Sequence, residues 1–236
     1  MLEKILDFIY PRRCISCDQI ISASKEHLCD NCKIFFKYIE EAMCVCCGGL
    51  VRQENVKCRD CIENDKLFTK NIPIFVYEDL VQDAIYRFKY GKKAHLGKGL
   101  GSIMAERLFQ MPNFLENLDY IVPIPIHRNR MKTRGFNQAE LLAKEISKVS
   151  GIPMGKNLIV RIRDTAPQSK VSFSGRKNNL KGALEVNKRY ALENKSILLV
   201  DDIYTTGNTL NACCEVLYKV GVKEVRATTL SIVVEE

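Results

Sequence analysis

Residues 197–210, with the sequence ILLVDDIYTTGNTL, restrict the possible folds of this chain more than any other segment. An aliphatic and β-branched run ends in Asp201 and Asp202, continues into a loop of threonines and glycine, and then enters a helical pattern. Backbone N–H groups and threonine hydroxyls at the start of a helix bind phosphate, and the helix dipole adds attraction. Carboxylates at the end of the strand can reach ribose hydroxyls or a Mg²⁺ ion. The segment therefore predicts a site for a ribose 5-phosphate group.

A helix cap is the simpler explanation of the same segment. Thr205 or Thr206 would cap the helix, and the two acids would be solvated at the end of a strand. This explanation accounts for one threonine, whereas the loop holds three beside a pair of acids. We therefore expect the phosphate to be held by Thr205, Thr206, Gly207, Asn208 and Thr209.

Strand-like and helix-like segments alternate through the rest of the second part of the chain. We expect strands at 72–76, 120–126, 158–162, 196–201 and 224–233, and helices at 79–88, 96–109, 137–149 and 209–220. The stretch between 162 and 184 is polar and irregular. This alternation predicts an α/β fold with a doubly wound, mainly parallel sheet. Ligands of such sheets bind beyond the carboxyl ends of the strands, where Asp201 and Asp202 fall.

Cysteine placement sets the first part of the chain apart. Nine of the eleven cysteines lie between residues 14 and 61, and eight of them form four Cys-x-x-Cys pairs. Two such pairs supply the tetrahedral shell of a structural Zn²⁺, so eight thiols predict two zinc ions. Sequential pairing is simplest, because eleven residues separate Cys17 from Cys29 and ten separate Cys47 from Cys58. The predicted ligands are Cys14, Cys17, Cys29 and Cys32 in one site and Cys44, Cys47, Cys58 and Cys61 in the other. We expect a zinc-binding module over residues 1–72 and the α/β domain over residues 73–236.

Other arrangements of the cysteines stay open at this point. The pairs can cross between the two sites, and an iron–sulfur cluster fits the spacing less well than zinc does. Disulfides would need an oxidising compartment, and the first ten residues do not look like a secretory signal. Cys46 and His27 are spare donors, because eight thiols already fill two tetrahedra. No apolar run reaches the roughly 18 residues that a membrane helix needs, and we expect a cytoplasmic protein.

The net charge of +8 belongs to the second part of the chain. Residues 1–72 hold eleven basic and eleven acidic residues, and two zinc ions on eight thiolates would make this part negative. Of the 25 other basic residues, 16 gather in three clusters, at 87–98, 128–134 and 156–181. Three such clusters beside a phosphate loop favour a polyanionic ligand: pyrophosphate, a nucleotide or a nucleic-acid backbone. The aromatic residues among them are candidates for base stacking: Tyr86, Phe88, Tyr90, Phe136 and Phe173.

A second strand runs into the basic cluster at 128–134. It reads VPIPIH at 122–127 and continues as RNRMKTRGFNQ. If this strand is adjacent to that of Asp201, then Arg128, Arg130 and Arg134 can face a pyrophosphate, because the planar guanidinium binds phosphate oxygens in pairs. His127 could transfer a proton or simply orient the loop.

Taken in order, these motifs resemble the ComF family. The matching segments are RFKYG at 87–91, PIPIH at 123–127, RGFNQ at 134–138, RDTAPQ at 163–168, RKNNLKGA at 176–183 and DDIYTTG at 201–207. The last of these is similar to the phosphoribosyl pyrophosphate (PRPP) motif of type I phosphoribosyltransferases. The resemblance covers essentially the whole chain and implies an N-terminal zinc-finger module joined to a phosphoribosyltransferase-like domain.

The resemblance also implies a function in bacterial natural transformation, where the protein would handle incoming single-stranded DNA. It implies a pocket for PRPP and Mg²⁺, with Asp201 and Asp202 as the catalytic pair at the ribose. Lys89, Arg128, Arg130 and Arg134 would contact the pyrophosphate. A helicase or a DNA-uptake channel protein would be the partner and would hold the protein at the inner face of the membrane. Transfer of ribose 5-phosphate from PRPP to a nucleobase or another acceptor stays open, because no segment that recognises an acceptor is evident.

Overall fold

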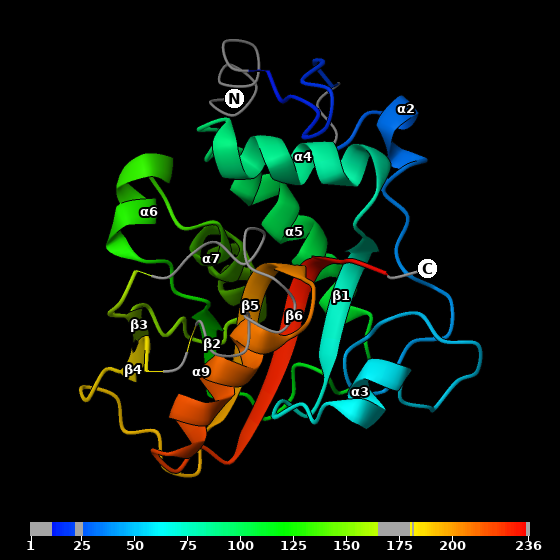
Figure 1. The fold of residues 1–236 in the computed structure, drawn as a ribbon. Helices are drawn as coiled ribbons and strands as arrows, with labels where there is room; N and C mark the ends of the chain where they lie inside the picture. Colours follow the sequence, from blue (N-terminus) through cyan, green and yellow to red (C-terminus); the bar gives the residue numbers. More distant parts are fainter. Residues whose placement is uncertain (1–10, 22–25, 165–179, 181, 235–236) are drawn as a thin grey trace.

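Four parallel strands form the central sheet in the order β1-β6-β5-β2 (Figure 1). The computed structural model describes residues 11–21, 26–164, 180 and 182–234. The strands are β1 (Asn71–Val76), β2 (Tyr120–Pro123), β5 (Ser196–Tyr204) and β6 (Glu224–Ile232). The predicted α/β fold with a mainly parallel sheet is confirmed. The strand that precedes the basic segment is indeed the neighbour of the strand that carries Asp201.

Helices cover both faces of this sheet. Leu198 and Val200 of β5 belong to a buried cluster shared with α4 (Asp79–Tyr90), α5 (Leu96–Phe109) and α7 (Gln138–Ser150). Ile197 and Leu199 belong to a second cluster, shared with α9 (Asn208–Tyr218). Side chains of a strand alternate between its two faces, so this division assigns one cluster to each side of the sheet. A strand covered on both faces reads as a continuous apolar run, as residues 197–200 do.

Three local expectations differ from the structure. The segment expected as a strand at 158–162 is β3 (Ile159–Arg161), which pairs antiparallel with β4 (Leu184–Val186) in a separate two-stranded sheet. Strand β2 ends at Pro123 and not at residue 126, because Pro123 and Pro125 have no N–H group to extend the ladder. The basic segment is a helix, α6 (Arg128–Arg134), and it has no buried residue, so no apolar periodicity could reveal it.

The cysteine-rich part consists of two similar units. Each carries its first Cys-x-x-Cys pair inside a tight antiparallel turn, closed by a bridge between Arg13 and Ile20 in one unit and between Met43 and Leu50 in the other. Each places its second pair at the start of a short helix, α2 (Asp30–Lys33) or α3 (Arg59–Glu63). We call residues 11–36 the first ribbon and residues 42–63 the second ribbon. In Figure 1 α2 lies near the start of α4, and α3 lies beside β1.

The two ribbons contribute to different cores. Cys14 and Cys32 belong to the cluster of α4, α5 and α7, whereas Cys44 and Cys61 belong to the cluster of α9. The second ribbon also packs tightly on the first residues of β1. Gly48 has φ of 75°, and a Cβ atom there would lie 2.2 Å from the Cδ atom of Pro73. Both the backbone angle and the lack of space therefore require glycine at this contact.

None of the helices within the described ranges has the length and the hydropathy that crossing a bilayer requires.

Candidate functional site

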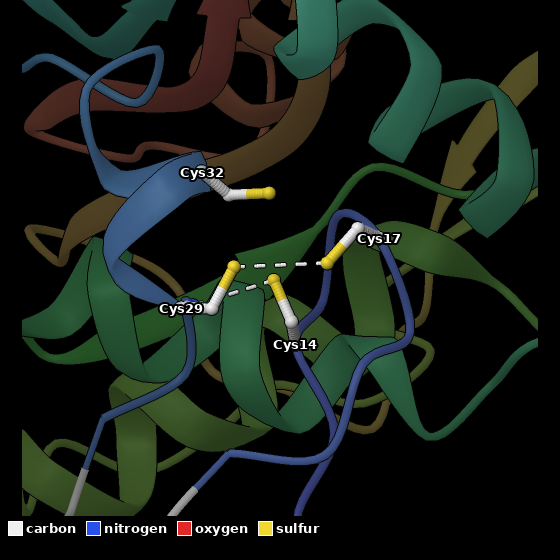
Figure 2. A group of neighbouring side chains, drawn as sticks. All are labelled: Cys14, Cys17, Cys29 and Cys32. Atoms are coloured by element: carbon white, nitrogen blue, oxygen red, sulfur yellow. Dashed lines mark hydrogen bonds between the residues drawn. The ribbon is translucent and has the colours of Figure 1, made fainter.

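Each ribbon brings four thiols together. The Sγ atoms of Cys14, Cys17, Cys29 and Cys32 all lie within 4.8 Å of one another, and so do those of Cys44, Cys47, Cys58 and Cys61. Figure 2 shows the first group, in which the four side chains converge from the turn and from the start of α2. The Sγ atoms of Cys17 and Cys29 are 3.7 Å apart, and those of Cys47 and Cys58 are 3.5 Å apart.

These distances fit zinc. A tetrahedral site with Zn–S bonds of about 2.3 Å places its sulfur atoms about 3.8 Å apart. Backbone N–H groups also point at the sulfurs: Cys29 N–H donates to Cys14 Sγ at 3.4 Å, and Cys58 N–H donates to Cys44 Sγ at 3.2 Å. Such bonds stabilise thiolates, which are the form that binds the metal. The chain thus has two zinc-binding sites of four cysteines each, grouped sequentially. Neither Cys46 nor His27 belongs to either group.

The acid pair lies in a cavity of about 450 Å³ at the carboxyl ends of β5 and β2. Lys89 of α4 reaches into it, and its Nζ atom is 2.9 Å from Oδ1 of Asp202. Asp201 accepts a hydrogen bond from the N–H of Asp202 at 2.8 Å. Burial, followed by the adjacent charge of Asp202, raises the pKa of Asp201 to about 7. The charge of Asp202 thus disfavours the charged form of Asp201, and a divalent cation bound to the pair would relieve this repulsion.

The loop that follows the acids turns sharply into α9. Gly207 has φ of 75°, and a Cβ atom there would lie 2.7 Å from the phenol oxygen of Tyr204. The N-cap residue of α9 is Gly207, which has no side chain to bond the first turn of the helix. Thr205 and Thr209 line the cavity of the acid pair, and Thr206 of the same loop is buried. A helix start with two threonine hydroxyls at the cavity wall has the chemistry of a phosphate site.

Among the described residues, three arginines also line the cavity: Arg130, Arg134 and Arg161. Burial, followed by Arg130, lowers the pKa of Arg161 to about 10. Burial, followed by Arg134, lowers the pKa of Arg130. The guanidinium groups thus weaken one another's charged forms, and a bound polyanion would reverse this effect.

The sequence-predicted residues divide between the cavity wall and its surroundings. Those that line the cavity with the acid pair are Lys89, Arg130, Arg134, Thr205 and Thr209. Arg128 is exposed and is not part of the wall, and neither are Thr206, Gly207 and Asn208 at the start of α9. His127 caps α6 by accepting a hydrogen bond from the N–H of Asn129 at 3.3 Å, as expected of a histidine that orients the loop. Sequence reasoning missed Arg161, whose only signal was its place in the basic cluster at 156–181.

Lys66 links the second ribbon to the loop of residues 205–207 that follows the acid pair. Lys66, whose side chain is only 3% exposed, forms an ion pair with Asp60 of α3 at 2.7 Å. Its Nζ atom also donates to the carbonyl oxygen of Thr206 at 3.1 Å. The side chain of Asn211 in α9 accepts from the N–H of Leu67 at 3.0 Å and donates to the carbonyl of Asp65 at 3.2 Å. The segment after the second ribbon therefore fixes the phosphate loop and the first turn of α9.

Comparisons with known proteins agree with this architecture. The double zinc ribbon domain matches residues 5–62, and the phosphoribosyl transferase domain matches residues 131–231. Competence protein F of Haemophilus influenzae is 30% identical over 93% of this chain and 96% of its own length. Competence protein ComFC of Bacillus subtilis is 29% identical over 83% of this chain and 80% of its own length. A purine phosphoribosyltransferase structure from Pyrococcus horikoshii aligns at 20% identity, with a TM-score of 0.35, over 56% of this chain and 70% of that one.

With near full-length similarity to competence protein F and with both expected domains in order, the chain belongs to the ComF family.

Proposed function

We propose that this protein handles incoming single-stranded DNA during natural transformation and that it does so with a pocket that binds Mg²⁺ and PRPP. The observation that carries the proposal is the convergence of three features in one cavity. These are the acid pair Asp201 and Asp202, the start of α9 with Thr205 and Thr209, and, among the described residues, the side chains of one lysine and three arginines. Ribose, 5-phosphate and pyrophosphate need these three chemistries.

Within this pocket each group has a distinct task. Asp201 and Asp202 would hold the ribose hydroxyls and the Mg²⁺ that accompanies PRPP. Thr205, Thr209 and the N–H groups of α9 would hold the 5-phosphate. Arg130, Arg134 and Arg161 would bind the pyrophosphate, with Lys89 between the acids and the cations. Bound Mg²⁺ would supply further charge neutralisation at the pyrophosphate.

Single-stranded DNA is supported as the second ligand by charge and by the names of relatives. The basic excess lies in the second part of the chain, and two of the protein's relatives are competence proteins. A helicase or an uptake-channel protein is the proposed partner, and the ribbons offer the exposed surface for it.

An active phosphoribosyltransferase is the second candidate function. In that reaction an acceptor atom bonds to the anomeric carbon of PRPP while the bond to pyrophosphate breaks. The cavity is also lined by Tyr77, Tyr86 and Tyr90, beside which an acceptor could bind.

The test of both candidate functions is a calorimetric titration of Mg²⁺–PRPP beside an assay of pyrophosphate release, with and without nucleobases and a single-stranded oligonucleotide. Release that needs one acceptor would establish the transferase, and binding without release would favour a PRPP-binding DNA-handling protein. Absence of PRPP binding would refute the pocket.

Arg130→Ala is expected to weaken the binding of PRPP about tenfold or more and that of ribose 5-phosphate much less. A charge-assisted hydrogen bond to a phosphate contributes about 1.5–3 kcal/mol, and only PRPP carries the pyrophosphate. Arg128→Ala is the matched control, because Arg128 lies on the same helix but outside the cavity wall. Calorimetry with both ligands measures the difference. Equal losses for the two ligands would remove Arg130 from the pyrophosphate site.

Binding of an oligonucleotide is expected to depend strongly on salt. If five cationic side chains contact phosphates of a single strand, a plot of the logarithm of the association constant against the logarithm of salt concentration has a slope of about −3.5. Fluorescence anisotropy between 50 and 300 mM salt, roughly the range in which such contacts titrate, measures this slope. A slope near zero would contradict binding through ionic contacts with the phosphate backbone.

A further inference from the structure

Two tyrosines of α4 are exposed although they are large aromatic residues. Tyr86 is 62% exposed and Tyr90 is 57% exposed. They are four residues apart on one helix, so their side chains lie on the same face, and their ring centroids are 5.0 Å apart with an interplanar angle of 48°. The buried face of α4 consists of other residues, among them Ile85 and Phe88. The tyrosine pair is therefore not needed to attach α4 to the core.

The pair borders the cavity of the acid pair. Tyr86 and Tyr90 both line it, together with Tyr77. Lys89, the residue before Tyr90, reaches Asp202 at 2.9 Å. Two exposed aromatic side chains and the acid pair therefore line the same cavity.

Positive charge accompanies these rings. The guanidinium carbon of Arg134 lies 5.2 Å from the ring centroid of Tyr90, in a cation–π contact. Arg134 also donates a hydrogen bond to Gln138 at 3.0 Å, which fixes the guanidinium beside the ring. Exposed aromatic faces next to fixed cations are the combination that binds unpaired bases: the ring stacks on the base and the cation attracts the phosphate.

The other aromatic candidates do not offer such a surface. Phe88 is fully buried, and Phe136 packs against it with ring centroids 5.6 Å apart. Phe173 lies outside the described residues. The stacking surface is therefore confined to Tyr86 and Tyr90 among the candidates that the structure describes.

We propose that Tyr86 and Tyr90 form a stacking site for an unpaired nucleobase at the mouth of the cavity. The inference rests on the proposed function, because it names the ligand that lies next to PRPP. The base can belong to a single-stranded nucleic acid or to a free nucleobase, and both present the same planar face. Stacking would place the base in the cavity of the acid pair, with the guanidinium of Arg134 beside the Tyr90 ring.

The test compares ligands that have bases with ligands that lack them. Tyr86→Ala/Tyr90→Ala and Tyr86→Phe/Tyr90→Phe are prepared as zinc-loaded full chains, with Phe109→Ala as control, since Phe109 is 55% exposed on α5 and does not line the cavity. The affinity of each variant is measured for three probes in the presence of Mg²⁺–PRPP: an oligothymidylate, an abasic oligonucleotide of equal length, and free nucleobases. Base stacking contributes about 1–3 kcal/mol per base, so the alanine variant should lose about tenfold or more in affinity for the oligothymidylate. The phenylalanine variant and the Phe109→Ala control should bind it as the wild type does.

Affinity for the abasic oligonucleotide and for PRPP should be unchanged in all variants. Equal losses for the abasic and the base-bearing oligonucleotides would overturn the proposal, because they would show a phosphate or folding effect. Unchanged oligothymidylate and free nucleobase binding in the alanine variant would overturn it as well. A loss confined to free nucleobases would identify the ligand as a small acceptor. Failure of the wild type to bind PRPP would refute the pocket assignment, while the comparison of oligonucleotides without PRPP would still decide whether the tyrosines stack.

Discussion

Replacement of both Asp201 and Asp202 by asparagine is expected to abolish the binding of Mg²⁺–PRPP. Both carboxylates line the cavity, and Asp202 forms an ion pair with Lys89 at 2.9 Å. Asparagine keeps the shape of each side chain but loses the charge that a magnesium–ribose site needs. Isothermal titration with PRPP measures the loss, and the circular dichroism spectrum should not change. Affinity within threefold of the wild type would remove the acid pair from the pocket.

The single variant Asp201→Asn should stabilise the ligand-free protein against unfolding above about pH 7. The pKa of Asp201 is raised to about 7 by burial and by Asp202, whereas an unperturbed aspartate has a pKa of about 3.9. Between these pH values the folded chain binds more protons than the unfolded chain. The free energy of unfolding therefore falls as pH rises from about 4 to about 7, and the full penalty acts above pH 7. Asparagine removes this penalty.

We expect Asp201→Asn to raise the melting temperature at pH 8 by about 2 °C or more and to change it little at pH 4. Asp83→Asn is the matched control, because Asp83 is exposed on α4 and does not line the cavity. Calorimetric scans without Mg²⁺ or PRPP give the melting temperatures. A lower melting temperature at pH 8 would show that the charge of Asp201 is already compensated in the folded chain.

Cys61→Ser in the second ribbon should reduce the zinc content from two ions per chain to one and also weaken the binding of PRPP about tenfold or more. Asp60 lies between the ligands Cys58 and Cys61, and it holds Lys66 at 2.7 Å. Lys66 in turn donates to the carbonyl of Thr206 in the phosphate loop. Loss of the metal frees α3, because a unit this small has too little core to hold its own shape. The buried lysine then loses its partner, which disturbs the loop.

Two further variants distinguish an effect through the contacts of Asp60, Lys66 and Thr206 from general unfolding. Cys32→Ser should also release one zinc ion, but its ribbon contacts Arg87 of α4, Lys93 and α5. None of these contacts is at a residue that lines the cavity, so PRPP affinity should fall less than threefold. Lys66→Met should keep both zinc ions and still weaken PRPP binding as Cys61→Ser does. Zinc content by mass spectrometry and affinity by titration give both quantities. Wild-type PRPP affinity in Lys66→Met would show that the link does not position the loop.

Local patterns carried most of what could be predicted from the sequence. The Cys-x-x-Cys pairs and the segment 197–210 each place their groups within a few residues, so spacing alone predicted both zinc sites and the path from strand to helix. Arg161 could not be assigned, because it reaches the cavity from a three-residue strand whose partner follows more than twenty residues later. The bond from Lys66 to Thr206 spans 140 residues and leaves no periodic signal. Helix α6 has no buried residue, and its N-cap is a histidine. Neither apolar periodicity nor a common N-cap residue could therefore predict this helix.

The division of the two ribbons between opposite faces of the sheet constrains the order of events during synthesis. Both sets of thiols are complete once residue 61 has been made, whereas the β5 and β6 residues that join their cores lie between residues 196 and 232. The first ribbon can pack early, because β1 and α5, which contact it, are made before residue 110. Folding from the N-terminus thus gives a metal-loaded second ribbon whose apolar partners in β5 and β6 emerge more than a hundred residues later. The nascent chain is consequently most exposed to aggregation in the interval between zinc loading and the emergence of its last strand.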